Sequence, residues 1–411
     1  MEPSDFDILT SADGQALIER HLTDDPARLA LKLRNPAVTQ QIRMLQRCRT
    51  KLPAFYAARC IVPQLAYEQA SSEAAAAART EGLTAAVPAG ERRLAVDLTC
   101  GLGVDALTLG RSFERVVAVE SDPLRARIAR WNFERLGAEN IEVVHDSAER
   151  FTELWEAEGR PAIDLVYVDP SRKTAEGKRV YSLEDSSPQI LDLLPALRRI
   201  ARRVVVKLSP LFDVSEVYRR FGPEASAEVI SLEGECKEVL ARIGFPDTEA
   251  DLRATVIRRG RVERFDFSRT VLTSETSSGQ EAKSTEEARF LLVPDVAFYK
   301  TRTVEAYCTQ YLAAEACNLR MAGGYLFSDE VPEQFAGKTY RITFRHPYHP
   351  KTISRMLRSR GIRRVNVHRR NFPFPAEEVA RALGVELGGT TDIFCLNVQN
   401  DLSVFFVLRI D

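Results

Sequence analysis

A short segment near residue 100 combines glycines and an acidic residue in a spacing that suits ligand binding. In VDLTCGLGVDALTLG, Gly101 and Gly103 follow a strand-like run and precede a helix-like one. Glycine lets the backbone turn tightly and approach a ligand where a side chain would obstruct it. Asp97, at the end of the strand-like run, can orient this turn or accept a hydrogen bond from a ligand amine. The segment predicts a binding site at a strand–turn–helix junction.

Polar residues also end the next two Val-rich runs. RVVAVE ends at Glu120, whose carboxylate can accept hydrogen bonds from both hydroxyls of a ribose. IEVVH is followed by Asp146 and Ser147, which suit the edge of an adenine. Ala106 stands where a dinucleotide-binding G-x-G-x-x-G turn would have its third glycine. The pattern therefore favours a nucleoside ligand over a dinucleotide.

The run DLVYVD leads into a fourth polar group, Asp169-Pro170-Ser171-Arg172. Asp169 can accept a hydrogen bond from a substrate N–H, and the carbonyl at Pro170 can share that role. Arg172 can stack its planar guanidinium on a base or clamp a phosphate. The alternative is that Asp169 only caps a loop and Arg172 is solvated.

A parallel sheet would bring these groups together. The Val-rich runs, from LAVDL to RRVVVKLS, alternate with amphipathic segments such as DPLRARIARWNFERLG. This alternation predicts an α/β, Rossmann-like domain whose mostly parallel sheet is covered by helices on both faces. Its strands would end at one rim, where such sheets bind ligands. Weaker strand signals follow at SAEVISL, LRATVIRRG and VERFDFS.

Further patterns divide the chain into five predicted parts. The first is helical, because PARLALKLR and PAVTQQIRMLQRCRTKL open on Pro and carry apolar residues at helical spacing. A Ser-, Thr- and Glu-rich segment after the sheet domain indicates a linker. The predicted parts are 1–88 (helical), 89–270 (sheet domain), 271–288 (linker), 289–335 (small α+β unit) and 336–411 (basic α+β unit).

The motifs as a set resemble a known family. DLTCGLGVD, Glu120, HDSAE and VDPSRK are similar to motifs I to IV of class I S-adenosylmethionine-dependent methyltransferases. With EQASSEA and the C-terminal region, the whole chain resembles bacterial methyltransferases that carry a ferredoxin-like insert and a C-terminal THUMP-like domain. The resemblance implies S-adenosylmethionine as cofactor and a catalytic centre at Asp169, Pro170, Ser171 and Arg172. It implies cofactor binding by Asp97, Thr99, Cys100, Gly101, Gly103, Asp105, Glu120, Asp146 and Ser147.

The same resemblance implies RNA, often tRNA, as substrate, with residues 289–335 ferredoxin-like and residues 336–411 THUMP-like. Two departures bear on the target atom. Amino-group methyltransferases follow their Asp-Pro with Pro and an aromatic, which is absent after Pro170, so an exocyclic-amine target is in doubt. Carbon-5 methylation of uridine needs a cysteine thiolate. Where the enzymes of that reaction place their cysteine, this chain has Lys207, Ser209 and Pro210. Lys207 could contact substrate phosphate or only cover the sheet edge.

The segment YEQASSEA lies in the part of the helical region that resembles the family. We hypothesise that Glu73 or one of the serines Ser71 and Ser72 faces the cofactor. A surface helix with small polar residues is the alternative.

The near-neutral net charge conceals a strongly basic segment. The chain has 57 Lys and Arg against 58 Asp and Glu, a net charge of −1, yet Gly337–Pro375 contains no Asp or Glu and eleven Lys and Arg. The rest of the chain therefore carries −12. Arg predominates, which favours bidentate phosphate contacts, although docking onto an acidic surface of the same protein is the alternative. The predicted RNA-binding residues are Arg341, Arg345, Lys351, Arg355, Arg358, Arg363, Arg364, Arg369 and Arg370.

Other features exclude several classes of protein. No secretory signal and no long apolar run are visible, so we expect a cytoplasmic protein without membrane segments. The seven cysteines are scattered and form no C-x-x-C pair, which argues against disulfides and a metal site. Two alternatives to RNA methylation remain: methylation of a protein or small molecule, and a non-catalytic module that binds cofactor and RNA.

Overall fold

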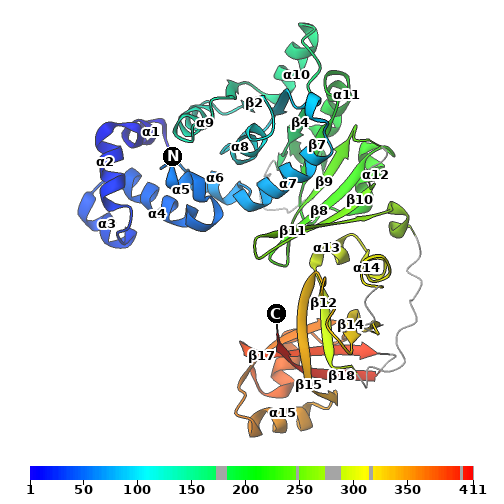
Figure 1. Ribbon diagram of the computed structural model, residues 1–411. Coiled ribbons are helices and arrows are strands. Elements are labelled where there is room, and N and C mark those ends of the chain that lie inside the picture. Colours follow the sequence, from blue (N-terminus) through cyan, green and yellow to red (C-terminus); the bar gives the residue numbers. More distant parts are fainter. Residues whose placement is uncertain (173–182, 247–249, 274–287, 314–317, 399–400, 411) are drawn as a thin grey trace. The chain divides into compact units, whose positions relative to one another are not determined.

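The structure is a computed structural model, and its described residues are 1–172, 183–246, 250–273, 288–313, 318–398 and 401–410. The chain divides into two compact units (Figure 1). The first consists of Met1–Leu232, Lys237–Arg253 and Ile257–Val262, and the second consists of Glu233–Cys236, Ala254–Val256 and Glu263–Asp411. The finer five-part division stays a prediction.

The N-terminal region is helical, as the sequence predicts. Its helices are α1 (Pro3–Thr10), α2 (Ala12–His21), α3 (Pro26–Leu33), α4 (Pro36–Lys51), α5 (Pro53–Ala57), α6 (Gln64–Gln69) and α7 (Glu73–Ala85). Proline stands in the first turn of α1, α3, α4 and α5, where a backbone N–H would have no partner within the helix. Val38 and Ile42 share a buried core with Ile128 of α9 (Pro123–Arg135). This core joins the helical region to the sheet domain.

A nine-stranded sheet forms the centre of the first unit, in the order β11-β10-β8-β9-β7-β4-β1-β2-β3. Its strands are β1 (Leu94–Asp97), β2 (Arg115–Glu120), β3 (Ile141–His145), β4 (Leu165–Val168), β7 (Val204–Leu208), β8 (Ser226–Leu232), β9 (Glu235–Ile243), β10 (Leu252–Arg258) and β11 (Arg261–Phe267). The neighbours among β3, β2, β1, β4 and β7 pair in parallel, whereas β9 pairs antiparallel with β7. The Val-rich runs are therefore parallel strands, as predicted, and β1, β2, β4 and β7 are mostly buried, whereas β3 at the sheet edge is only partly buried.

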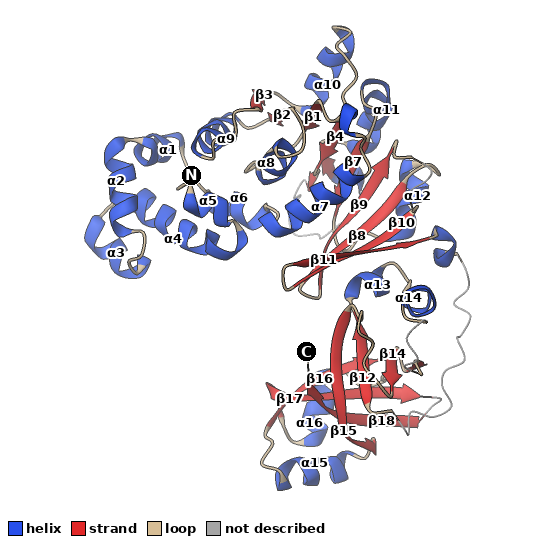
Figure 2. Ribbon diagram, viewed as in Figure 1, coloured by secondary structure: helices blue, strands red, loops and turns tan. Residues whose placement is uncertain are grey.

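Helices cover both faces of this sheet. The additional ones are α8 (Val104–Gly110), α10 (Ala148–Ala157), α11 (Ile190–Ile200) and α12 (Val214–Phe221). Figure 2 shows α7, α8 and α9 on one side of the strands and α10, α11 and α12 on the other. α7 packs against α8, and α10 packs against α11. This is the doubly wound arrangement that the alternating pattern predicts.

Strand β9 has no counterpart among the predicted strands. Its sequence, ECKEVLARI, carries four charged residues, so its apolar pattern is weak. Two of these, Glu238 and Arg242, are buried. Arg242 lies 3.8 Å from Glu228, and Glu238 contacts Arg79 of α7. Because pairing compensates buried charge, β9 lies inside the sheet despite its composition.

A seven-stranded sheet forms the second unit, in the order β13-β14-β12-β15-β18-β17-β16. Its strands are β12 (Phe290–Pro294), β13 (Arg320–Ala322), β14 (Tyr325–Ser328), β15 (Gly337–Pro347), β16 (Arg364–Arg370), β17 (Glu386–Val398) and β18 (Asp401–Arg409). Its helices are α13 (Val296–Lys300), α14 (Val304–Tyr311), α15 (Pro350–Ser359) and α16 (Ala376–Leu383). β15 pairs with both β12 and β18, so the segments 289–335 and 336–411 contribute to one sheet.

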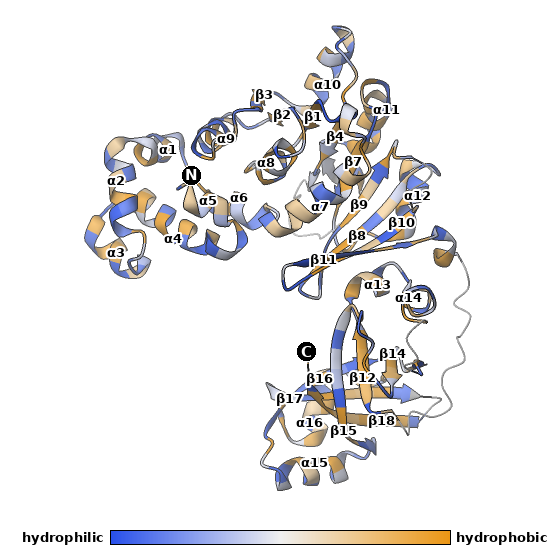
Figure 3. Ribbon diagram, viewed as in Figure 1, coloured by the Kyte–Doolittle hydropathy of each residue, from blue (hydrophilic) through white to orange (hydrophobic). Residues whose placement is uncertain are grey.

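Apolar residues concentrate on the strands of both sheets, whereas the helices alternate between apolar and polar residues (Figure 3). In the second unit, β17 and β18 pair antiparallel, as expected for the predicted closing hairpin. The predicted linker 271–288 lies mostly outside the described residues. A short 3-10 helix, Arg269–Leu272, overlaps its first two residues.

Candidate active site

The order of the strands locates the candidate site. Along the chain, successive strands extend from β1 through β2 to β3 on one side and through β4 to β7 on the other. A crevice therefore opens at the carboxyl ends of β1 and β4, where open α/β sheets bind ligands. Thr99 follows β1 and Asp169 follows β4, and the Asp169 backbone N–H donates to Thr99 Oγ1 at 2.7 Å. This bond joins the two strand ends.

The glycine turn is built as the sequence predicts. Gly101 and Gly103 have φ angles of +54° and +86°, in the left-handed region that favours glycine. A Cβ on Gly103 would lie 2.5 Å from the Phe133 ring, so the turn packs tightly on α9. Between the two glycines and β1, Cys100 is buried, and burial raises the pKa of its thiol. Cys100 therefore contributes backbone to the turn rather than a reactive thiolate.

Asp97 places an unsatisfied acceptor beneath this turn. Its side chain is 1% exposed, and Oδ1 accepts from the Thr99 N–H at 2.9 Å. Oδ2 is buried and has no partner among the described residues. Burial, together with the negative charge of Asp105, raises the pKa of Asp97 to about 8. Since buried polar atoms normally have partners, Oδ2 fits a cationic or N–H group of a ligand.

The carboxylate of Glu120 holds the turn from the neighbouring strand. Its Oε2 accepts from the Gly101 N–H at 2.9 Å. Its Oε1 accepts from the Asp122 N–H at 2.9 Å and from Arg125 Nε at 3.0 Å. The residue is 5% exposed. A ribose at the predicted position would have to share this carboxylate with Arg125.

Asp146 and Ser147 follow β3, the next strand of the rim. Asp146 Oδ1 accepts from the Ser147 N–H at 2.9 Å, and Ser147 Oγ caps α10 by accepting from the Arg150 N–H at 3.1 Å. Arg150 Nε also lies 3.6 Å from Asp146. Both side chains thus have local structural roles, and an adenine contact stays a prediction.

A buried arginine connects the start of α8, directly after the glycine turn, to β9. Arg79 of α7 is 1% exposed, and its guanidinium contacts Asp105, in the first turn of α8, and Glu238 of β9. Burial alone would lower the pKa of Arg79, but Asp105 and Glu238 raise it above its usual range. Arg79 is therefore a permanent cation between two carboxylates. Neither Arg79 nor Glu238 is predicted from the sequence.

A second ion pair holds the Asp169 carboxylate. Lys207 Nζ lies 2.6 Å from Asp169 Oδ2 and donates to Ser71 Oγ at 3.1 Å. Burial lowers the pKa of Lys207, but the negative charges of Asp169, Asp105 and Glu238 together raise it above its usual value. Lys207 therefore positions Asp169, an arrangement not among its two predicted roles. Asp169 itself is 34% exposed and accessible from the rim.

Ser71 links the two ion pairs. It accepts from Lys207 and also from Arg79 Nη2 at 3.2 Å. A continuous chain of contacts thus runs from Asp105 through Arg79, Ser71 and Lys207 to Asp169. Of the three candidate residues in YEQASSEA, Ser71, Ser72 and Glu73, only Ser71 enters this chain of contacts. The side chains of Ser72 and Glu73 instead accept hydrogen bonds at the starts of α7 and α5.

The other two residues of that segment stabilise helix ends. Ser72 Oγ caps α7 by accepting from the Ala75 N–H at 3.2 Å. Glu73 Oε1 accepts from the Ala54 and Phe55 N–H groups at 2.9 and 3.4 Å, at the start of α5. Both side chains therefore have structural roles.

The remainder of the predicted catalytic group follows Asp169. Pro170 is half-buried, and Ser171 is exposed and donates from Oγ to the Ser187 carbonyl at 3.2 Å. Ser171 and Arg172 form strand β5, which pairs with β6 (Ser186–Ser187). Residues 173–182 lie outside the described residues. The proposed contact of Arg172 with a base or phosphate stays a prediction.

The predicted RNA-binding residues belong to the second unit. Arg341 and Arg345 lie on β15, Arg363 precedes β16, and Arg364 and Arg369 lie on β16. All of these except Arg345 are exposed. Arg364 lies 3.5 Å from Glu386 of β17.

Arg370 differs from the others because it packs within the unit. Its guanidinium lies 3.3 Å from the Tyr299 ring centroid and 5.5 Å from that of Tyr325. Such a stacked arginine contributes packing as well as charge. Arg370 is therefore the least available of the predicted RNA contacts.

Helix α15 has the clearest basic face. Ile353 and Leu357 are buried, whereas Lys351, Arg355 and Arg358 are exposed. The three cations are spaced i, i+4 and i+7, so they lie along one side of the helix. None of them forms an ion pair with a described residue.

The aromatic residues of this segment are core anchors. Tyr340 and Phe372 are buried, and Phe344, Tyr348 and Phe374 pack against the core from partly buried positions. The sequence left open whether they stack on a ligand. Their packing favours a structural role.

Within the described residues, no group of three His, Cys, Asp or Glu side chains could hold a metal ion. None of the described helices has the length and apolar character needed to cross a membrane.

Comparison with known proteins identifies relatives for both units. Residues 337–409 match the family described as THUMP domain-like. Over 173 residues the chain is 32% identical to an uncharacterized S-adenosylmethionine-dependent methyltransferase of Mycobacterium tuberculosis, a match that covers 41% of this chain and 44% of the relative. Over 96 residues it is 33% identical to a tRNA/tmRNA (uracil-C(5))-methyltransferase of Acinetobacter baumannii, covering 20% and 27%. The chain thus spans less than half the length of either relative.

One crystal structure is similar to nearly the whole chain. It is that of a protein of Porphyromonas gingivalis W83 assigned as a methyltransferase, with a TM-score of 0.75 and 22% sequence identity. The match covers 95% of this chain and 96% of that one, and it confirms the predicted fold class. The predicted resemblance is confirmed in two respects: this chain has S-adenosylmethionine-dependent methyltransferases among its relatives and carries a THUMP-like domain at its C-terminus. The ferredoxin-like character of residues 289–335 stays a prediction.

Proposed function

We propose that this protein is an S-adenosylmethionine-dependent methyltransferase that acts on RNA, with its C-terminal THUMP-like domain binding the RNA. The observation that carries the proposal is that two carboxylates, those of Asp97 and Asp169, lie at the carboxyl ends of the neighbouring strands β1 and β4. Asp97 offers a buried acceptor with no described partner, and Asp169, tied to Thr99, is held by Lys207. One site suits a ligand beneath the glycine turn, and the other suits a substrate at the rim.

The residues around the glycine turn fit the cofactor. S-adenosylmethionine supplies an electrophilic methyl group that a substrate atom attacks in line. Gly101 and Gly103 allow the backbone to approach it closely, and Glu120 holds the turn in place. Asp97 Oδ2 would accept from the cationic amino group of the cofactor. Positioning of this kind supplies much of the rate in such a displacement.

Asp169 is the chain's own contribution at the reacting atom. Lys207 occupies Oδ2, which leaves Oδ1 to accept from a substrate N–H. Lys207 and Ser71 together fix the direction of the carboxylate. A nitrogen of a base is the target that this geometry favours.

Methylation of carbon 5 of uridine is not part of the proposal, although one relative is named for that activity. That chemistry needs a cysteine thiolate at the rim. Cys100 is buried with a raised pKa, and Cys236 and Cys308 lie on β9 and α14. Cys317 lies outside the described residues.

The THUMP-like match and the exposed cations of α15 support RNA as the partner. Phosphate contacts of this type position an RNA without reading its sequence. We propose tRNA within this class, a cytoplasmic location and no metal requirement. Methylation of a protein or small molecule, and cofactor binding without catalysis, are the competing outcomes.

Mass spectrometry of nucleosides tests this proposal. RNA from a deletion strain should lack one methylated nucleoside, which returns on complementation with the wild-type chain. Complementation with Asp169→Ala should not restore it, although this variant should still bind S-adenosylhomocysteine. An unchanged set of methylated nucleosides in the deletion strain would contradict the proposal.

A further inference from the structure

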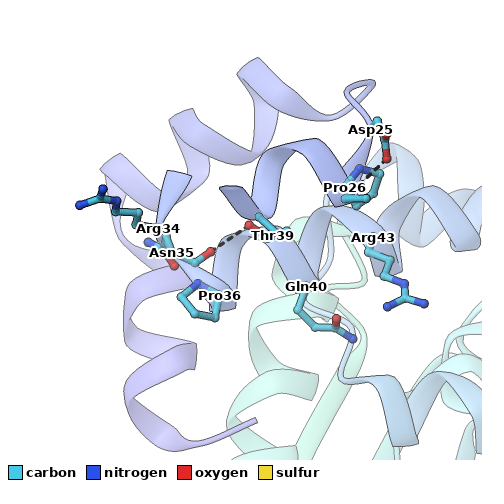
Figure 4. Close-up of a pocket in the computed structure, with 10 residues that line it drawn as sticks. Asp25, Pro26, Arg34, Asn35, Pro36, Thr39, Gln40 and Arg43 are labelled. Atoms are coloured by element: carbon cyan, nitrogen blue, oxygen red, sulfur yellow. Dashed lines mark hydrogen bonds between the residues drawn. The ribbon is translucent and has the colours of Figure 1, made fainter. Parts of the chain in front are cut away.

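The helical region contains a pocket that the proposed function does not use. It has a volume of about 640 Å³ and is lined by α3, the turn after α3 and the first half of α4. Arg34 and Arg43 line it together with Asn35, Thr39 and Gln40 (Figure 4). Figure 4 shows the two guanidinium groups at opposite sides of the pocket. None of the predicted site residues lies here.

The cations of this pocket are exposed and unpaired. Arg34, Arg43 and the neighbouring Lys32 are exposed, and none forms an ion pair with a described residue. Most other exposed arginines of the first unit pair with an acid. Arg199, for example, lies 2.5 Å from Glu156. Arg34 and Arg43 thus place two cations without a described acidic partner at one pocket, which forms a positive surface rather than part of a network of internal ion pairs.

The surrounding sequence strengthens this surface. From Pro26 to Tyr67 the chain contains no Asp or Glu and eight Lys and Arg. The rest of the chain has 58 Asp and Glu against 49 Lys and Arg. An acid-free stretch of this length repeats the composition of Gly337–Pro375 at the other end of the chain. Solvated helix faces normally mix both signs.

One carboxylate does line the pocket, but it is already engaged. Asp25 Oδ1 caps α3 by accepting from the Ala27 N–H at 3.0 Å, and Oδ2 lies 3.7 Å from Arg28. It therefore leaves Arg34 and Arg43 uncompensated. Glu68, the next acid along the chain, accepts from Gln64 at 3.0 Å and lies 4.0 Å from Arg47.

We infer that the pocket between α3 and α4, lined by Arg34 and Arg43, is a second RNA-binding surface that contacts the phosphate backbone. The inference rests on the proposed function and extends it to a region with no assigned role. Exposed cations around an open pocket suit an extended polyanion, and arginine favours phosphate oxygens. Thr39 and Asn35 already bond within α4, so this surface would bind backbone rather than read bases.

The surface has a fixed place in the first unit. Asn132 of α9 accepts from the Ile61 N–H at 2.8 Å and donates to the Ile61 carbonyl at 3.0 Å. Arg127, also on α9, bonds Asp7 at 2.8 Å. These contacts hold the helical region against the sheet domain. RNA bound at α3 and α4 would therefore be held by the same compact unit that carries Asp169.

Salt-dependent RNA binding by the full chain tests the inference. The probe is fluorescein-labelled bulk bacterial tRNA, and the variant combines Arg34→Gln and Arg43→Gln. We expect the variant to bind roughly three- to tenfold more weakly near 0.15 M salt, and the slope of log Kd against log salt to fall by about 1.5. The charge-retaining Arg34→Lys, Arg43→Lys variant should keep the wild-type slope.

A matched control removes the same charge from paired arginines. Arg115 and Arg199 are exposed and contact Glu142 and Glu156, and their double Gln variant should bind like the wild type. Wild-type affinity and slope in the pocket variant, with the α15 cations still required, would overturn the inference and leave the proposed function intact. Absence of salt-dependent tRNA binding by the wild type would overturn both. Binding of the pocket to phosphatidylserine vesicles but not to tRNA would also overturn it.

Discussion

At the scale of single residues, the site depends on carboxylates whose surroundings differ. Asp97 is buried beside other acids and has one unpartnered oxygen, whereas Asp169 is paired and partly exposed. The first is suited to bind a cation, and the second is suited to accept from a substrate. The sequence predicts both positions because each ends a Val-rich strand. It does not predict the electrostatics, which arise from the burial of Asp97 beside Asp105 and from the ion pair of Asp169 with Lys207.

Asp97 should make cofactor binding depend on pH. Its pKa is about 8 in the free protein, so the carboxyl is mostly protonated at neutral pH. Binding of an ammonium group favours the charged form and releases a proton. We expect the affinity for S-adenosylhomocysteine to rise from pH 6 to pH 8, with proton release detectable by calorimetry in two buffers. Asp97→Asn should bind roughly 10- to 100-fold more weakly at pH 8 and lose this pH dependence.

The same substitution should stabilise the folded chain at high pH. The pKa of Asp97 is raised from 3.8 to about 8 on folding. Between these values the unfolded chain has released a proton that the folded chain keeps, so the free energy of unfolding falls as pH rises. Asp97→Asn should therefore raise Tm by at least about 4 °C at pH 9 and change it little at pH 4. An equal effect at both pH values would refute the buried ionisation.

Lys207 should act on catalysis through Asp169. Lys207→Met removes the 2.6 Å ion pair, so kcat should fall roughly 10- to 100-fold, while affinity for S-adenosylhomocysteine stays the same. Lys207→Arg should recover part of the activity, because its cation can still reach Asp169. Lys300→Met, in α13 of the second unit, is the control. A variant that lost affinity for the cofactor but kept its kcat would contradict the proposed role of Lys207 in positioning Asp169.

At the scale of elements, the sequence predicts the strands and helices whose buried residues are apolar. The strands of the parallel sheet and the helices of the first 85 residues follow from Val-rich runs, apolar spacing and N-terminal prolines. Strand β9 was missed because it carries buried charges, and Arg79 has no local signal within a run of alanines. Their importance depends on contacts across 159 residues of sequence, between Arg79 and Glu238. The common sheet of 289–335 and 336–411 likewise depends on long-range pairing.

Arg79 joins three elements, α7, α8 and β9, so its loss should destabilise the whole first unit. Arg79→Met would leave Asp105 and Glu238 without their cation in a buried site. We expect the free energy of unfolding to fall by about 3–5 kcal/mol in urea titrations. Adding Glu238→Gln should restore part of it, since one uncompensated charge is removed. A loss below about 1 kcal/mol would show that the buried ion pairs are not needed for the fold.

At the scale of the whole molecule, the net charge of −1 is the sum of unlike parts. Two acid-free stretches, at 26–67 and 337–375, lie in a chain that is otherwise acidic. The composition alone predicts only that a uniformly basic surface is absent. Exposure in the structure separates the available cations, such as those of α15, from Arg370, which packs on tyrosines.

The basic face of α15 should govern RNA affinity without affecting the cofactor. A triple Gln variant at Lys351, Arg355 and Arg358 removes exposed charges but keeps Ile353 and Leu357 in the core. Its affinity for bulk tRNA should fall roughly tenfold or more, and its salt slope by about 2. Affinity for S-adenosylhomocysteine should be unchanged. An unaltered salt slope would contradict phosphate binding by this helix.

The most direct measurement is methyl transfer in vitro with RNA from the deletion strain. The purified chain is incubated with S-adenosylmethionine labelled in its methyl group, and the products are digested with nuclease to nucleosides. The account predicts that the label appears in one nucleoside, and that Asp169→Ala transfers none. Label that survives nuclease and migrates with protein, or appears in a small molecule, would contradict it.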